Sequence, residues 1–109
     1  MLPLKTFFKI ASYDYQQLER HGDLAIFSQT HRENPKVVRY EVVMIREEKE
    51  KVWANGRVTP ERERYPGSSE WGIYGWTHWT LAQAQSKLRE LQAARQNLSP
   101  SKTAERVSV

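Results

Sequence analysis

The sequence predicts an α+β domain, in which an antiparallel sheet of about four or five strands carries one C-terminal helix packed on one face. Three observations predict this fold class. Segments rich in β-branched and aromatic residues all lie before residue 80. The one segment with helical spacing, at about 80–98, follows them. With 109 residues the chain has room for a single domain, which we place at 1–98 before a tail at 99–109 that is expected to be disordered.

The first predicted strands form a hairpin preceded by one further strand. Residues 4–10 are rich in aromatic and β-branched side chains and predict that first strand. A His-Gly-Asp turn signal at 21–23 separates a strand at about 15–20 from another at 24–30, and together they predict the hairpin. The polar residues 31–36 include Asn-Pro and predict a loop after it.

The strongest strand signal lies at residues 37–47. The odd-numbered positions mix apolar residues with Arg39 and Glu41, so this face is expected to be half exposed. The even-numbered positions from 38 to 44 are wholly apolar and are expected to face the core. They are Val38, Tyr40, Val42 and Met44.

The stretch after this strand mixes turn signals with short strand-like segments. Residues 47–51 predict a hydrophilic turn or a strand extension, and Asn-Gly at 55–56 predicts a hairpin with short flanks. Residues 60–72 contain two Pro and two Gly and predict an exposed loop. Residues 73–79 combine β-branched and aromatic side chains and predict a further strand.

A helix is predicted to begin after Thr80. Thr80 is a good N-cap, and Gln83, three residues on, completes a capping-box pattern. Ser99-Pro100 is expected to end the helix. Because a helix of this length is marginal on its own, its apolar stripe is expected to pack on the sheet. The stripe positions are Leu81, Ala84, Leu88, Leu91, Arg95 and Leu98.

Composition excludes several classes of protein. The chain has no Cys, which excludes a disulfide scaffold, a Cys nucleophile and a thiolate metal site. No run of about 18 apolar residues occurs, so no membrane-spanning segment is predicted and a cytoplasmic location is expected. The formal net charge is +4, but charges at 46–51 and 61–64 alternate in sign and largely cancel. The charge is therefore weak support for a nucleic-acid partner.

No catalytic or cofactor motif occurs in the sequence. The three histidines, His21, His31 and His78, lack the spacing of metal ligands. Neither the GxSxG nucleophile elbow nor a GxGxxG or Walker phosphate-binding loop is present. We therefore expect a protein without enzymatic activity, cofactor or bound metal.

Aromatic residues are concentrated at 65–79, where they alternate with glycines. They are Tyr65, Trp71, Tyr74, Trp76 and Trp79. One interpretation places these rings in the core beneath the helix, and the other leaves some of them exposed as anchors for a partner. Because one helix covers one face of a strand, one of two pairs is expected to be partly exposed or covered by a loop. The pairs are Tyr74 with Trp76 and Trp71 with Trp79.

Residues 70–91, EWGIYGWTHWTLAQAQSKLREL, resemble the second half of the WGR domain, which pairs a Trp-Gly strand with a helix carrying leucine, alanine and leucine. The resemblance covers about a fifth of the chain and departs from the family pattern at Ile73, where the family has arginine. WGR domains bind nucleic acid or sense DNA ends, so the resemblance implies a nucleic-acid partner. The layout is also similar to that of small proteins encoded by bacteria, phages and mobile elements.

We hypothesise a non-enzymatic domain that binds another macromolecule, in the first place a protein, through residues 65–79. The anchors would be Trp71, Trp76 and Tyr74. The charged rim would be Arg57, Arg62 and Arg64.

Two alternatives remain open. One is nucleic-acid binding, with bases stacked on aromatic rings and cations on the phosphates. Those cations would be Arg57, Arg62, Arg64, Lys87 and Arg95. The other is a homo-oligomer, such as a homodimer, formed through an uncovered face of the sheet.

Overall fold

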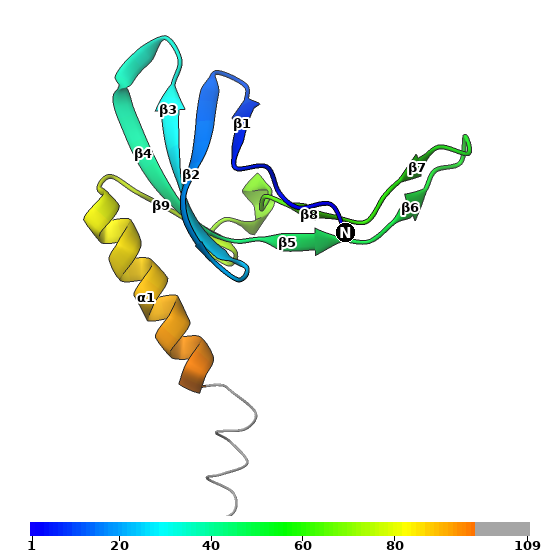
Figure 1. Cartoon of the computed structure of the whole chain (residues 1–109). Coiled ribbons are helices and arrows are strands. Elements are labelled where there is room, and N and C mark those ends of the chain that lie inside the picture. The colour runs from blue at the N-terminus through cyan, green and yellow to red at the C-terminus, as the bar shows by residue number, and fades with distance from the viewer. Residues whose placement is uncertain (98–109) are drawn as a thin grey trace, which may run out of the picture.

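The body of the protein is a five-stranded antiparallel sheet with one helix on one face (Figure 1). The computed structural model describes residues 1–97, so the tail predicted at 99–109 lies outside the described residues. Neighbouring strands follow the order β1-β2-β3-β4-β9, and this arrangement confirms the predicted α+β class. The elements are β1 Phe7–Ile10, β2 Tyr13–His21, β3 Leu24–His31, β4 Asn34–Met44, β9 Gly75–His78 and α1 Leu81–Asn97.

The hairpin predicted at 15–30 is confirmed by β2 and β3, which pair as antiparallel neighbours. Gly22 in the connecting turn has a φ of 64°, in the left-handed region that glycine adopts without steric cost. The loop predicted at 31–36 is wrong, because β4 already begins at Asn34 after a two-residue turn. A register shift in the β3–β4 ladder leaves Pro35 in a bulge, where its missing N–H breaks no ladder bond.

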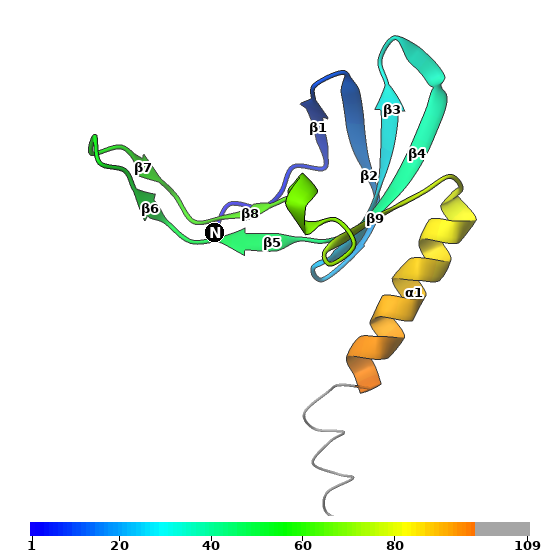
Figure 2. The ribbon, with the colours of Figure 1, turned by 180° about the vertical axis from the view of Figure 1, so that it is seen from behind.

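Residues 46–64 leave the sheet as a long two-stranded extension, called the arm below (Figure 1). Seen from behind, the arm again projects away from both the sheet and α1 (Figure 2). The turn at the far end of the arm, between its last two paired strands, contains Asn55-Gly56 and confirms the hairpin predicted there. No residue of the arm is buried. Its strands are β5 Arg46–Glu48, paired with β8 Arg62–Arg64, and β6 Lys51–Val52, paired with β7 Val58–Thr59.

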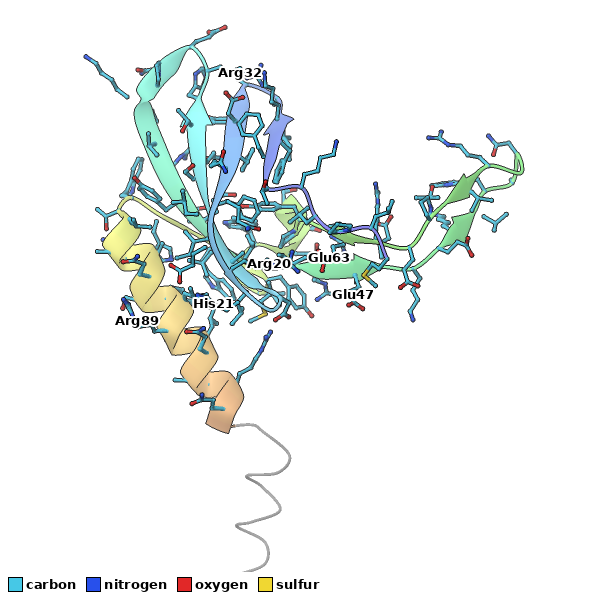
Figure 3. All side chains as sticks on the ribbon, viewed as in Figure 1. Arg20, His21, Arg32, Glu47, Glu63 and Arg89 are labelled. Carbon is cyan, nitrogen blue, oxygen red and sulfur yellow. The ribbon has the colours of Figure 1, made fainter. Side chains whose placement is uncertain are left out.

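Hydrogen bonds and an ion pair hold the base of the arm on the sheet. Arg20 on β2 donates two hydrogen bonds to the Glu63 carboxylate, at 3.0 and 2.7 Å, and the two side chains lie together in Figure 3. Glu63 also accepts a hydrogen bond from the Leu4 N–H at 2.9 Å. The guanidinium of Arg20 holds the pKa of Glu63 below its usual value. These contacts join three segments that are distant in the sequence.

The sheet is covered on both faces. α1 covers one face, where its Ala84 and Leu88 are buried against Leu24, Ile26 and Val42 of the sheet. The opposite face, called the far face below, is covered by side chains from the N-terminal segment and from residues 65–71. Its buried residues are Tyr15, Ala25, Phe27, Val43 and Ile45.

Two predictions about exposure are therefore wrong. The odd-numbered positions of β4 are expected to be half exposed, but Glu41 and Val43 are only 6% and 0% exposed. The segment 60–72 is expected to be an exposed loop, but it contains β8 and the 3-10 turn η1 (Ser68–Glu70), and its Pro66 is buried. Both errors have one cause, because this segment folds back over the far face.

α1 begins where the sequence predicts. The Thr80 N–H donates to Gln83 Oε1 at 3.3 Å, and the Gln83 N–H donates to Thr80 Oγ1 at 3.2 Å, which confirms the capping box. Arg95, the polar member of the predicted stripe, forms an ion pair with Asp23 at the β2–β3 turn. Among residues 1–97, no helix has both the length and the apolar character needed to cross a membrane.

Candidate functional site on the far face of the sheet

A cleft of about 630 Å³ opens on the far face, where β1, β2 and β4 meet the segment after β8. The strands contribute apolar, aromatic and carboxyl side chains, and the segment contributes two further aromatic rings and a Pro-Gly-Ser turn. The volume lies within the range of pockets that hold small ligands. The lining residues are Ile10, Tyr15, Glu41, Tyr65, Pro66, Gly67, Ser68 and Trp71.

Glu41 supplies the carboxyl group of the cleft and is almost fully buried. Its Oε1 accepts a hydrogen bond from the Tyr65 hydroxyl at 2.7 Å, and its Oε2 accepts a longer one from the Thr77 hydroxyl at 3.4 Å. Burial raises the pKa of Glu41 above its usual value. Within residues 1–97, Glu41 forms no ion pair, so neutral hydroxyl groups alone satisfy its oxygens.

Tyr65 anchors the segment that closes the cleft. Its ring meets those of Phe8, Tyr15 and Phe27 edge to face, at centroid distances of 5.2, 5.6 and 5.2 Å. Burial, followed by the charge of Glu41, raises the pKa of the Tyr65 hydroxyl. The hydroxyl therefore stays protonated at neutral pH and donates to Glu41.

Trp71 forms one wall of the cleft and is half buried. Its indole N–H donates to Thr77 Oγ1 at 2.9 Å, which ties the ring to β9. The ring lies against the backbone of Gly75, where an added Cβ would come within 3.0 Å of three ring carbons. Only glycine at position 75 allows this close approach.

Arg39 stands beside the cleft on the same face of β4 as Glu41. Its guanidinium lies 5.7 Å from the ring centre of Tyr13 and 5.8 Å from that of Trp79. One of its amino groups donates to the Tyr13 hydroxyl at 3.3 Å. Trp79 is 70% exposed, so this arrangement presents an open indole ring to solvent.

The anchors predicted from the sequence lie in different places. Trp71 belongs to the cleft on the far face, whereas Trp76 packs on the helix side, with the Lys87 ammonium 4.6 Å from its ring centre. Tyr74 lies beneath the Arg46 guanidinium, at 3.7 Å. The structure therefore does not bring the three rings together on one surface.

The predicted cations are mostly engaged by carboxylates. Arg62 pairs with Glu48 at 3.1 Å, and Arg64 pairs with Glu70 at 2.7 Å. Arg64 thereby lowers the pKa of Glu70 to about 2. Lys87 and Arg95 also form ion pairs, with Glu90 and Asp23. Arg57 lies at the turn of the arm, and its backbone N–H is bonded to Asn55.

The tip of the arm exposes three apolar side chains, Val52, Trp53 and Val58, which are 68%, 45% and 51% exposed. Trp53 is held in place on both sides. Its indole N–H donates to Thr59 Oγ1 at 2.8 Å, and the Lys51 ammonium lies 3.8 Å from its ring centre. The tip thus presents a fixed aromatic ring next to the cross-strand pair of Val52 and Val58.

The sequence did not identify Glu41, Arg39 and Tyr13 as residues of a candidate site. Glu41 carries a usable signal, because it is an acid within an otherwise apolar run of β4. Such a residue in a central strand either faces solvent or is buried with hydrogen-bond partners. Which of these holds depends on Tyr65, which lies 24 residues further along the chain.

Comparison with known protein families, with curated proteins and with solved structures gave no match to this chain. The resemblance of residues 70–91 to the WGR domain therefore stays a prediction. Among residues 1–97, no group of three or more His, Asp or Glu side chains is arranged to hold a metal ion.

Proposed function

We propose that this chain is a non-enzymatic domain that binds another protein, with the tip of the arm as the principal contact. One observation carries the proposal. The arm extends from residue 46 to residue 64 and contributes no residue to either buried core, yet it displays Val52, Trp53 and Val58 to solvent. An arm that packs on neither core and exposes apolar side chains at its tip is best explained by contacts of that tip outside its own domain.

The physical properties of the tip fit a protein interface. An isolated two-stranded ribbon is marginally stable in water, so an exposed one gains most from a partner that covers it. Tryptophan is enriched among the residues that dominate binding energy. Trp53 is already held by Thr59 and Lys51, so binding would cost little side-chain entropy.

Charge favours a protein over a nucleic acid. Four of the five cations in the nucleic-acid alternative form ion pairs within the domain, which leaves them less free to contact phosphates. They are Arg62, Arg64, Lys87 and Arg95. Along the arm, cations and anions alternate and present no continuous basic surface.

Site-specific photo-crosslinking tests the proposal. p-Benzoylphenylalanine is placed at Trp53, and at Phe7 as the control, because the two side chains are 45% and 46% exposed. Each labelled protein is irradiated in a lysate of the organism that encodes the chain. We expect one discrete protein adduct from position 53, absent at position 7 and abolished by an excess of wild-type protein but not of the Trp53→Ala variant.

Other outcomes would contradict the proposal. An adduct that nucleases remove would indicate a nucleic-acid partner. An adduct of twice the chain's mass, formed by the purified protein alone, would indicate a homo-oligomer. Equal labelling at both positions would mean that the tip has no specific partner.

A further inference from the structure

Glu41 is a buried carboxyl group that forms no ion pair with any residue from 1 to 97. Buried acids are nearly always paired with a cation, because the loss of hydration is otherwise uncompensated. Within residues 1–97, the Glu41 carboxyl group accepts two side-chain hydrogen bonds, from the hydroxyl groups of Tyr65 and Thr77. Burial raises its pKa, which indicates that these hydroxyls do not fully replace water.

The nearest arginine on this face does not serve as that counter-ion. Arg39 stands two residues from Glu41 along β4, but its guanidinium lies between the rings of Tyr13 and Trp79. It donates to the Tyr13 hydroxyl and forms no ion pair with Glu41. The charge of Arg39 lowers the pKa of Glu41, but less than burial raises it, and the carboxyl group has no ion-pair partner among the described residues.

The walls of the cleft also suit a cation. Tyr15, Tyr65 and Trp71 line the cleft together with Glu41, and the faces of aromatic rings attract positive charge. Ile10 and Pro66 add apolar surface that an alkyl chain can cover. An ammonium group already packs on an aromatic ring elsewhere in the chain, where Lys87 lies over Trp76.

We propose that this cleft binds an alkylammonium group, with Glu41 as its counter-ion and the three aromatic rings around its carbon chain. The group could be a free amine or a lysine side chain of a partner protein. Its chemistry is the same in both cases, and the site lies apart from the tip of the arm. Failure at either site therefore leaves the other proposal standing.

The test is an NMR titration of the ¹⁵N-labelled protein, followed at the Trp71 indole N–H, which lies in the cleft wall. The probes are n-butylammonium and an acetylated pentapeptide, Gly-Gly-Lys-Gly-Gly amide. The matched neutral controls are n-butanol and the same peptide with norleucine. We expect saturable shifts of the Trp71 signal with both cations, at least about tenfold weaker binding of the neutral controls, and a comparable loss for Glu41→Gln.

Two variants make the result decisive. Glu41→Gln keeps the shape of the side chain, and its thermal unfolding checks that it folds. Arg39→Gln removes a like charge beside the cleft and is expected to tighten cation binding. Tighter binding of the peptide than of butylammonium would identify a partner's lysine as the source, and the reverse order a free amine.

Three outcomes would overturn the proposal. In the first, no cation shifts the Trp71 signal. In the second, butanol or the norleucine peptide binds as well as its charged counterpart, or Glu41→Gln binds as well as wild type. In the third, Arg39→Gln weakens binding, which would make Arg39 part of the site and an anionic group its occupant.

Discussion

Replacing Gly75 by alanine perturbs the closest packing on the far face. A Cβ there would come within 3.0 Å of three carbons of the Trp71 ring. The ring cannot move aside freely, because its N–H is bonded to Thr77 at 2.9 Å and its neighbour Tyr65 lies 6.4 Å away, centre to centre. Either the Trp71 ring or the backbone at position 75 must therefore move, and such a movement would first lengthen the hydrogen bond from the Trp71 indole to Thr77.

The magnitude follows from three contributions. Overpacking of a well-packed core costs about 1–3 kcal/mol, and a lost hydrogen bond adds about 1 kcal/mol. The lower chain entropy of alanine in the unfolded state offsets about 0.5–1 kcal/mol. We therefore expect Gly75→Ala to lose about 1–3.5 kcal/mol of the free energy of unfolding, which lowers the Tm of a domain of this size by about 4–28 °C.

The assay is thermal and urea unfolding followed by circular dichroism, with Gly67→Ala as the control. A Cβ at Gly67 would meet only Glu70 Oε1, at 3.8 Å, and the backbone there is extended, with a φ of −79°. We expect the control to lie within about 1 kcal/mol of wild type. In a Trp71→Ala background the Gly75→Ala substitution should cost much less, because the clashing ring is gone.

Two results would refute this reasoning. One is a Gly75→Ala variant as stable as Gly67→Ala. The other is an equal cost of Gly75→Ala with and without the Trp71 ring.

Three further predictions concern stability. Because burial raises the pKa of Glu41, its ionisation opposes folding, so Glu41→Gln should raise the Tm at pH 7, and the gain should fade as the pH falls through this raised pKa and be lost below about 4. Because Arg20 lowers the pKa of Glu63, Glu63→Gln should lower the Tm at pH 7, with a deficit that shrinks in acid as wild type loses the same ion pair. Tm values from pH 3 to 8 check both, and pH-independent differences would contradict them. Thr80→Ala should cost about 1 kcal/mol in urea unfolding, and no loss would exclude a stabilising capping box.

Features set by neighbours in the sequence were predictable. The capping box joins Thr80 to Gln83, three residues apart, and the residue types suffice to predict it. The turn at Gly22 and the hairpin at Asn55-Gly56 likewise depend on local backbone conformation. Strand alternation in β4 correctly assigned Val42 to the core, and the structure places it on the helix side.

Features that depend on packing between distant segments could not be predicted from the sequence. Alternation places Glu41 and Val43 on one face but does not say what covers that face. The cover comes from Tyr65 and Trp71, in a segment whose Pro and Gly content is typical of an exposed loop. The burial of the candidate site therefore rests on long-range packing that propensity and periodicity do not encode.

In the aromatic segment at 65–79, one feature was predicted from the sequence and another was not. Period-two spacing predicted that Trp71 and Trp76 would lie on opposite faces, and the structure places them in the far-face and helix-side clusters. It did not predict that each ring would be half buried by a different element. Trp79, two residues beyond Thr77, is the ring of this segment that remains mostly exposed.

Removing the tip of the arm tests the central claim most directly. Glu48 and Arg62 pair across β5 and β8, so residues 49–61 can be replaced by an Asn-Gly turn that closes a shorter hairpin. Since neither core includes an arm residue, the shortened domain should unfold at nearly the wild-type temperature. The account predicts that it no longer competes with the position-53 probe for its protein adduct. A folded, shortened domain that competes as well as wild type would contradict it.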